Sequence, residues 1–181
     1  SNMNQALNSA LDKIEEAQAR GGSITGLSTG FADLDKLTSG LQPADMIVLA
    51  GRPSMGKTSL GMNIADHVAQ TSGKHVMVFS LEMPEDQLTR RLLASNGMVN
   101  MTKINNANLD DDDWGRLSMA TSKLMESKML IDDAGGLTPS ELRARAKRAH
   151  KENELGLIII DYLGLMRVPQ LAGNRNAEIS E

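Results

Sequence analysis

Residues 46–60 have the sequence MIVLAGRPSMGKTSL, which joins an apolar run to a turn of small residues and then to a new helix. The apolar run 46–50 predicts a β-strand, and apolar residues at helical spacing predict a helix over 58–70. The turn between them contains glycines, which let the backbone bend and direct its N–H groups towards a phosphate. This stretch therefore predicts an α/β domain with a phosphate-binding loop.

Residues 51–58 match the pattern G-x-x-x-x-G-K-[ST] at every fixed position. In this pattern the loop N–H groups and the helix N-terminus bind phosphate, the lysine reaches the β- and γ-phosphates, and the last hydroxyl ligates Mg²⁺. Lys57 and Thr58 take the last two roles. The expected cofactors are therefore ATP, or another nucleoside triphosphate, and Mg²⁺. The residues expected to bind the nucleotide are Gly51, Arg52, Pro53, Ser54, Met55, Gly56, Lys57, Thr58 and Ser59.

Strand and helix signals alternate along the rest of the chain. Apolar runs predict further strands over 75–81, 129–131 and 157–160, and the last of these is apolar at every position, as in strands covered on both faces. Such alternation predicts an α/β fold with a mainly parallel sheet. The other predicted helices are 84–95, 111–126 and 139–151, with a short helix near 31–37.

A second magnesium ligand is predicted at Asp161. This residue directly follows the apolar run 157–160 in the sequence LIIIDY. In α/β sheets, ligands bind beyond the carboxyl ends of the strands. Paired with the phosphate-binding loop, Asp161 is therefore expected to hold the metal together with Thr58.

Hydrolysis needs one more group, which polarises the attacking water. Glu82 follows the strand 75–81 in the sequence FSLEMPED. If that strand lies next to the Asp161 strand, the Glu82 carboxylate faces the γ-phosphate. Glu85 and Asp86 are rivals, but they stand in the first turn of a helix, where acidic residues are favoured in any case.

The composition limits the class of protein. The 181 residues correspond to one domain, or to one domain with an extension. The chain has no cysteine, which excludes disulfides and thiolate metal sites and fits a cytoplasmic protein. No apolar run approaches the roughly 20 residues that cross a bilayer. With a net charge of −4 and only one Trp, one Tyr and two Phe, any nucleic acid would be held by its backbone rather than by base stacking.

The N-terminal residues 3–20 predict a helix with a narrow apolar side, formed by Leu7, Leu11 and Ile14. So thin a stripe cannot fold alone, and we interpret this helix as an appendage that docks on a partner surface. Packing on its own domain remains the alternative. The predicted organisation is an extension over 3–22 and an α/β domain over 23–181.

Two charged clusters have simple interpretations. Residues 110–113 are four consecutive aspartates whose side chains must point in different directions, so we interpret them as a helix start rather than a metal site. The basic residues of the helix 139–151 are interpreted as an exposed face or a subunit contact, with direct DNA contact as the alternative. They are Arg143, Arg145, Lys147, Arg148 and Lys151.

Five segments together resemble the C-terminal motor domain of the DnaB-type replicative DNA helicases, from about residue 24 to the end. The resemblance implies a RecA-like P-loop NTPase core in a ring-shaped hexamer, which hydrolyses nucleoside triphosphate at subunit interfaces while moving 5′→3′ on single-stranded DNA. It implies Lys57 and Thr58 as phosphate and magnesium residues, Asp161 as the second metal ligand, and Glu82 as the catalytic base. It also implies that the helix 3–22 is a linker docking on the neighbouring subunit. The segments are GLSTGFADLDKLTSGLQPADMIVLAGRPSMGKTSL, FSLEMPEDQLTRRLLAS, TKINNANLDDDDW, IDDAGGLTPSELRARAKRAH and LIIIDYLGLMRVP.

The resemblance also implies a first DNA-binding loop after the Asp161 strand. In it, Arg167, Asn174 and Arg175 would meet the phosphates of single-stranded DNA, with an ordinary solvated loop as the alternative. The other partners implied are further copies of the chain, in a hexamer, and a primase and a helicase loader that bind parts outside this chain. The implied location is the cytoplasm, in bacterial or phage replication machinery. One departure is Gly164, where the family usually has Gln, and it puts the order of the following loop in question.

The resemblance further implies an incomplete sheet. In the family, the strand between the phosphate-loop strand and the Asp161 strand comes later in the chain, as do the arginine finger and a second DNA loop. We therefore expect a gap with unpaired backbone groups at the centre of the sheet. Loss of an arginine finger costs roughly 10³–10⁵ in rate, so the chain alone is expected to hydrolyse ATP very slowly.

Three other functions share parts of this pattern. A RecA- or RadA-like recombinase shares the core, but SLEMPED and DYLGLMRVP favour the helicase. A P-loop small-molecule kinase would need a lid carrying arginines, and no such insertion stands out. A nucleotide-regulated assembly protein would bind ATP without turnover, and Glu82→Gln would distinguish it from an ATPase.

Overall fold

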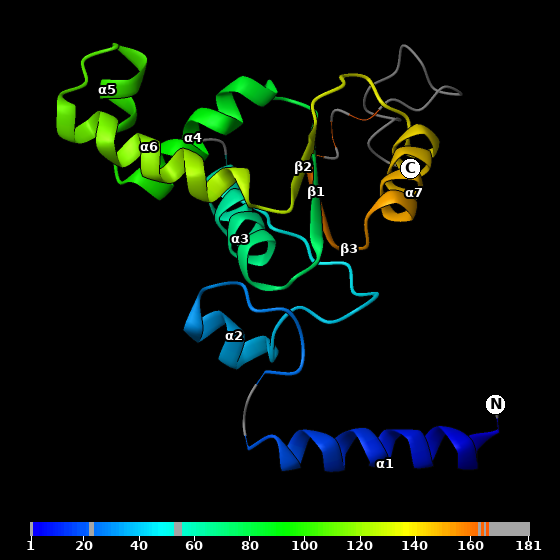
Figure 1. The fold of residues 1–181 in the computed structure, drawn as a ribbon. Helices are drawn as coiled ribbons and strands as arrows, with labels where there is room; N and C mark the ends of the chain where they lie inside the picture. The colour runs from blue at the N-terminus through cyan, green and yellow to red at the C-terminus, as the bar shows by residue number, and fades with distance from the viewer. Residues whose placement is uncertain (1, 22–23, 53–55, 163, 165, 167–181) are drawn as a thin grey trace. The chain divides into compact units, whose positions relative to one another are not determined.

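Residues 2–21, 24–52, 56–162, 164 and 166 are described in the computed structural model of the protein (Figure 1). The chain divides into two compact units, Ser1–Val48 and Leu49–Glu181. The first contains helices α1, Met3–Ala19, and α2, Ala32–Thr38, and the second contains the sheet and its helices. The predicted division into 3–22 and 23–181 stays a prediction. None of the helices described is long and apolar enough to cross a membrane.

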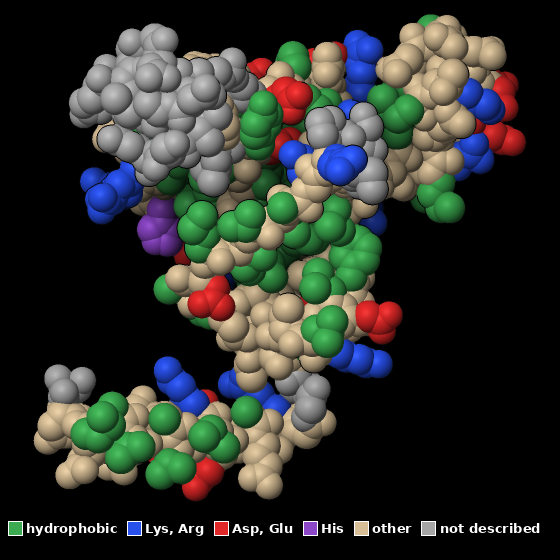
Figure 2. All heavy atoms as spheres, turned by 180° about the vertical axis from the view of Figure 1, so that it is seen from behind, with side chains coloured by type: hydrophobic (Ala, Val, Ile, Leu, Met, Phe, Trp, Pro, Cys, Tyr) green, Lys and Arg blue, Asp and Glu red, His purple; other side chains and the backbone are tan. Residues whose placement is uncertain are grey.

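Helix α1 confirms the predicted N-terminal helix. It begins at a capping box in which Asn2 and Gln5 bind each other's backbone N–H groups. None of its residues is buried, and Figure 2 shows hydrophobic side chains exposed along it. Leu7 is 52% exposed and Ile14 61% exposed. The predicted apolar side of α1 therefore faces solvent in this structure.

The rest of the first unit is organised around the buried carboxylate of Asp35 in α2. One oxygen of Asp35 accepts hydrogen bonds from the N–H and the hydroxyl of Thr29, at 2.9 and 2.7 Å, and the other accepts one from the Ser28 hydroxyl at 2.7 Å. Antiparallel backbone bonds between Leu27 and Leu41 close the loop around this cluster. Because hydrogen bonds to an ionised group are the strong ones, Asp35 fixes the loop that precedes the phosphate-binding segment.

A parallel sheet lies at the centre of the second unit and confirms the predicted α/β fold. In the part of the chain that the structure describes, it has three strands: β1, His75–Ser80, β2, Met129–Asp132, and β3, Leu155–Asp161. The order is β2-β1-β3, so β1 lies in the middle. In the register of β1 and β3, Ser80 lies opposite Asp161.

Helices cover both faces of this sheet (Figure 1). Helix α3, Lys57–Thr71, contacts the strands on one face, and helix α7, Pro139–Glu152, contacts them on the other. Successive side chains of a strand point to opposite faces. Phe79 is therefore fully buried in one cluster with Leu142 of α7, while its neighbour Val78 points to the α3 face. This double covering explains the continuous apolar runs in the strands.

Three helices connect β1 to β2: α4, Glu85–Gly97, α5, Met101–Asn105, and α6, Asp111–Met125. Helix α4 contacts both α5 and α6. Helices α4 and α6 confirm the predicted helices. The short helix α5 was not predicted, because a single turn leaves too few positions for a hydrophobic period.

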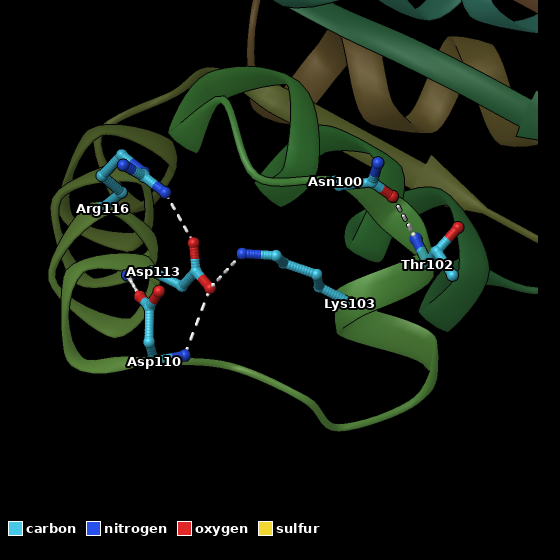
Figure 3. A network of polar contacts seen from close by, with 6 residues as sticks. All are labelled: Asn100, Thr102, Lys103, Asp110, Asp113 and Arg116. Carbon is cyan, nitrogen blue, oxygen red and sulfur yellow. Dashed lines mark hydrogen bonds and ion pairs between the residues drawn. The ribbon is translucent and has the colours of Figure 1, made fainter.

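The buried carboxylate of Asp113 joins α5 to α6 (Figure 3). Its side chain is 1% exposed and pairs with Lys103 of α5 at 3.1 Å and with Arg116. It also accepts a hydrogen bond from the N–H of Asp110 at 3.2 Å, while the Asp110 side chain accepts one from the N–H of Asp113 at 2.7 Å. This reciprocal pair is a capping box, so the predicted helix start at 110–113 is confirmed.

The strand predicted over 46–50 is wrong, because these residues form no strand in the structure. Their apolar side chains are exposed, with Met46 at 78% and Val48 at 68%. A strand exists only where a neighbouring strand completes its backbone hydrogen bonds. No strand among the described residues pairs with this segment. An apolar run alone is therefore not enough to make a strand here.

We expect Asp113 to make the stability of the protein depend on acid. The N–H of Asp110, helped by Lys103 and Arg116, holds the pKa of the Asp113 carboxyl below its ordinary value, although burial acts in the opposite direction. The unfolded chain titrates near the ordinary value of about 3.9, so it binds protons there that the folded chain does not. The stability from Asp113 is therefore fully present above that value and is lost as the pH falls through the lowered pKa.

Urea unfolding followed by circular dichroism tests this expectation. Between about pH 6 and about pH 3, the midpoint of the wild-type protein should fall further than that of Asp113→Asn, whose side chain cannot ionise. Asp111→Asn is the matched control, since Asp111 is exposed in the same helical turn, and it should follow the wild type. Equal falls for the wild type and Asp113→Asn would contradict the assignment.

Candidate nucleotide-binding site

The phosphate-binding loop meets helix α3 at Gly56. This residue caps α3 in the left-handed conformation, with φ 79°, which favours glycine over any residue that carries a Cβ. Because the cap is a glycine, it offers no side chain to bond the first N–H groups of α3. An uncapped helix N-terminus carries a partial positive charge and free donors, so it suits an anion. Gly51, Arg52 and Ser59 are exposed, while Pro53, Ser54 and Met55 lie outside the described residues.

The structure brings Thr58 and Asp161 into direct contact. The hydroxyl of Thr58, in the first turn of α3, donates a hydrogen bond of 2.9 Å to Oδ2 of Asp161, at the carboxyl end of β3. The two residues are 103 positions apart in the sequence. A hydroxyl and a carboxylate are hard oxygen ligands, the kind that Mg²⁺ prefers beside phosphate oxygens. The residues present therefore fit a magnesium ion bound together with a phosphate.

Glu82 lies next to this pair in the sheet. Its strand β1 pairs directly with β3, and the N–H of Leu81 donates to the carbonyl of Asp161 at 2.8 Å. Glu82 is the following residue, and it is exposed. From the sequence, Glu82 is expected to face the γ-phosphate if its strand lies next to the strand of Asp161, and β1 and β3 are neighbours. The rivals Glu85 and Asp86 stand in the first turn of α4, as expected.

Lys57 lies over an aromatic ring that the sequence did not single out. Its ammonium is 5.3 Å from the centroid of Tyr162, which directly follows Asp161. Gly164 allows this position of the ring, because a Cβ there would be 2.8 Å from Cε2 of Tyr162. A pattern search for phosphate ligands misses Tyr162, since a tyrosine after the metal-binding acid has no fixed role in such a pattern. The one sequence signal that pointed to this place was Gly164, where the family usually has Gln.

The DNA-binding prediction cannot be placed on the structure. Arg167, Asn174 and Arg175 lie outside the described residues. The basic helix is described: four of its five cations are exposed, whereas Arg145 pairs with Asp132 at 2.8 Å. Both DNA interpretations therefore stay predictions.

These features define the class of the fold as a RecA-like P-loop domain. They are a helix N-terminus capped by glycine, a lysine, and a threonine bonded to an aspartate at the end of a strand. The family follows from comparison with known proteins. Residues 26–181 match the family model "DnaB-like helicase C terminal domain". The chain belongs to this family.

Curated relatives agree. The chain is 46% identical over 183 residues to "Replicative DNA helicase DnaB" of Buchnera aphidicola. This match covers 99% of the chain and 39% of the relative. It is 50% identical over 181 residues to the protein of the same name from Pasteurella multocida, with coverages of 97% and 38%. It is 42% identical to "Replicative DNA helicase DnaC" of Bacillus subtilis, with coverages of 99% and 40%. The chain thus spans about two fifths of the length of these relatives.

Solved structures show the same fold. One, "ATPase Domain of G40P", matches with a TM-score of 0.88 and 30% identity, covering 99% of this chain and 63% of that chain. Another, "The Structure Of A DnaB-Like Replicative Helicase And Its Interactions With Primase", matches with a TM-score of 0.87 and 30% identity, covering 99% and 43%. These matches cover nearly the whole chain, so the lack of strand pairing at residues 46–50 does not change the overall fold.

Proposed function

We propose that this chain is the ATP-hydrolysing motor part of a replicative DNA helicase. The observation that carries the proposal is the contact of Thr58 with Asp161 beside the paired strands β1 and β3. It gathers a metal-ligand pair and a candidate base, from elements distant in the sequence, at the end of one sheet. The names of the relatives support the choice of a helicase among P-loop ATPases.

The nucleotide would bind through the loop and the start of α3. The loop N–H groups and the α3 N-terminus hold the phosphates. Thr58 and Asp161 would hold Mg²⁺, which neutralises charge on the β- and γ-phosphates when it is bound. This arrangement uses Gly51 to Ser59 as the sequence predicts, with ATP or another nucleoside triphosphate as the ligand.

Lys57 is available for the phosphates although it lies over Tyr162. A cation–π contact at a partly exposed site stabilises by about 0.5–1 kcal/mol. A hydrogen bond between charged groups contributes about 1.5–3 kcal/mol. We therefore expect Lys57 to exchange the ring for the phosphate oxygens, with Tyr162 holding the ammonium near the site beforehand.

Glu82 would act as the catalytic base. From the turn after β1, its carboxylate orients the attacking water and accepts its proton, which is the role that a positioned acid plays in phosphoryl transfer. Its exposure gives water access to it. The neighbouring strands β1 and β3 and the resemblance support this role.

The finer functions are proposals on the same basis. We infer 5′→3′ movement on single-stranded DNA by a hexamer, with α1 docking on the neighbouring subunit through its exposed apolar side. One of the similar solved structures is of a helicase described together with its interactions with primase, which supports primase as a partner of the complete protein. A helicase loader and a cytoplasmic location complete the proposal.

The metal-ligand assignment is tested by Asp161→Asn in the full-length protein. The amide keeps a hydrogen-bonding partner for Thr58, so the thermal midpoint should stay close to that of the wild type. The loss of the carboxylate should weaken the Mg²⁺-dependent part of ATP binding by at least about tenfold, since even an indirect metal partner has an effect of that size. Calorimetric titrations with and without Mg²⁺ measure it. Thr58→Ser keeps the hydroxyl and should bind as the wild type does. An unchanged Mg²⁺ effect in Asp161→Asn would rule out this ligand.

The catalytic base is tested by Glu82→Gln. ATP binding should persist, because the amide has nearly the same shape, while kcat should fall by about 10²–10⁴, the contribution of a positioned base. Glu85→Gln is the matched control, since Glu85 lies in the first turn of α4, and its kcat should stay within about twofold of the wild type. Hydrolysis retained in Glu82→Gln would remove Glu82 as the base.

Binding to DNA through its backbone is tested by salt. Fluorescence anisotropy with mixed-sequence oligonucleotides should show affinity for single strands falling steeply with salt, with a log–log slope of about −0.7 for each phosphate contacted. Oligonucleotides of different sequence should bind alike. A flat salt response would count against backbone contacts.

A further inference from the structure

The position of Glu82 depends on the turn 81–84, which connects β1 to α4. The Glu82 side chain is exposed, and it forms no hydrogen bond or ion pair with any other residue that the structure describes. Its carboxylate is therefore placed by the backbone of the turn. At the β1 end, the backbone is fixed by the hydrogen bond from Leu81 to the carbonyl of Asp161, at 2.8 Å.

The other end of the turn is held by Asp133. This residue follows β2, and its Oδ2 accepts a hydrogen bond of 2.9 Å from the N–H of Glu85, the first residue of α4, across 48 positions of sequence. The cap residue of α4 is Pro84, whose side chain has no group to bond the orphan N–H groups of the helix. Asp133 thus supplies, from the segment after β2, the cap that α4 lacks locally.

Asp133 is itself held in place by its surroundings. The preceding residue, Asp132, pairs with Arg145 of α7 at 2.8 Å, and its other oxygen accepts a hydrogen bond from the N–H of Ala134 at 3.0 Å. The backbone on both sides of Asp133 is therefore tied to the core of the domain. A residue so anchored can fix the more exposed turn that it bonds.

We propose that Asp133 is a positioning residue for ATP hydrolysis, which holds the start of α4 and thereby keeps Glu82 beside Asp161. This inference rests on the proposed function, in which Glu82 is the base. Without Asp133, the first turn of α4 loses its cap and frays. The turn 81–84 is then held from its β1 side, by the bond from Leu81 to Asp161 and by a bond of 2.7 Å from the Ser80 hydroxyl to the carbonyl of Met83, and its α4 end gains freedom. A base displaced by about 1 Å can cost about 10²-fold in rate, even when the change lies outside the reacting groups.

The test measures single-turnover ATP hydrolysis by the full-length protein, with enzyme in excess, together with the ATP dissociation constant and the thermal midpoint. Asp133→Ala removes the acceptor, and Asp133→Ser, whose hydroxyl is too short to reach, is a second variant for the same purpose. Asp133→Asn keeps an oxygen acceptor. Asp110→Ala is the matched control, since Asp110 is also an exposed aspartate that caps a helix, away from Glu82.

We expect Asp133→Ala and Asp133→Ser to hydrolyse ATP about 10–100-fold more slowly, with the dissociation constant within about twofold of the wild type. Asp133→Asn should restore the rate to within about threefold, and Asp110→Ala should keep it. Glu82→Gln combined with Asp133→Ala should be no slower than Glu82→Gln alone, because there is then no base to position. If Asp133→Ala acted by unfolding the protein, it would instead slow hydrolysis by the same factor in the wild type and in Glu82→Gln.

Three results would overturn the inference: a wild-type rate in both Asp133→Ala and Asp133→Ser, an equal loss in Asp110→Ala, or a further loss in the double variant. Failure of the proposed function has a different signature, which is hydrolysis retained in Glu82→Gln alone. The two ideas are thus separated within one set of measurements.

Discussion

The parallel pairing of β1 with β3 is the constraint on which the rest of the site depends. Parallel strands end at the same edge of a sheet, so pairing in the register of Ser80 with Asp161 brings Asp161 and the turn after β1 together. Helix α3 then joins this edge through the bond between Thr58 and Asp161. A slip of one residue in this register would move every side chain of one strand to the opposite face, against the other layer of helices. Burial of both faces therefore sets the site as well as the core.

The acidic residues divide into those that maintain the fold and those at the sheet edge. Asp35 and Asp113 are buried, and each accepts several hydrogen bonds, which for Asp113 include those of two cations. Asp161 has one side-chain bond, to Thr58, among the described residues, and Glu82 has none. Acids with spare acceptor capacity at a strand end are suited to a metal or a water, whereas saturated ones are suited to holding loops. Asp133 lies between these groups, because it is exposed and its hydrogen bond, from the N–H of Glu85, holds the start of a helix rather than a loop.

Much of the fold and of the candidate site could be predicted, because the signals were local. The helix start at 110–113 depends on residues only three positions apart, and it forms as predicted, with a capping box. The strand over 46–50 could not be judged in this way, since strand formation depends on a distant partner that the apolar pattern does not reveal. Asp133 could have been predicted in the same way as Asp161, because it also follows a strand, β2, at the carboxyl edge of the sheet. Tyr162 was not, because its place over Lys57 depends on the missing side chain at Gly164.

Tyr162 gives the site a built-in spectroscopic reporter. It is the only tyrosine of the chain, and its ring lies 5.3 Å from the Lys57 ammonium. A ring beside a cation has magnetic resonance signals that depend on that cation, so departure of the lysine towards a phosphate would change them. One unlabelled aromatic residue can therefore report whether the phosphate-binding loop is empty or engaged, without any dye or added tag.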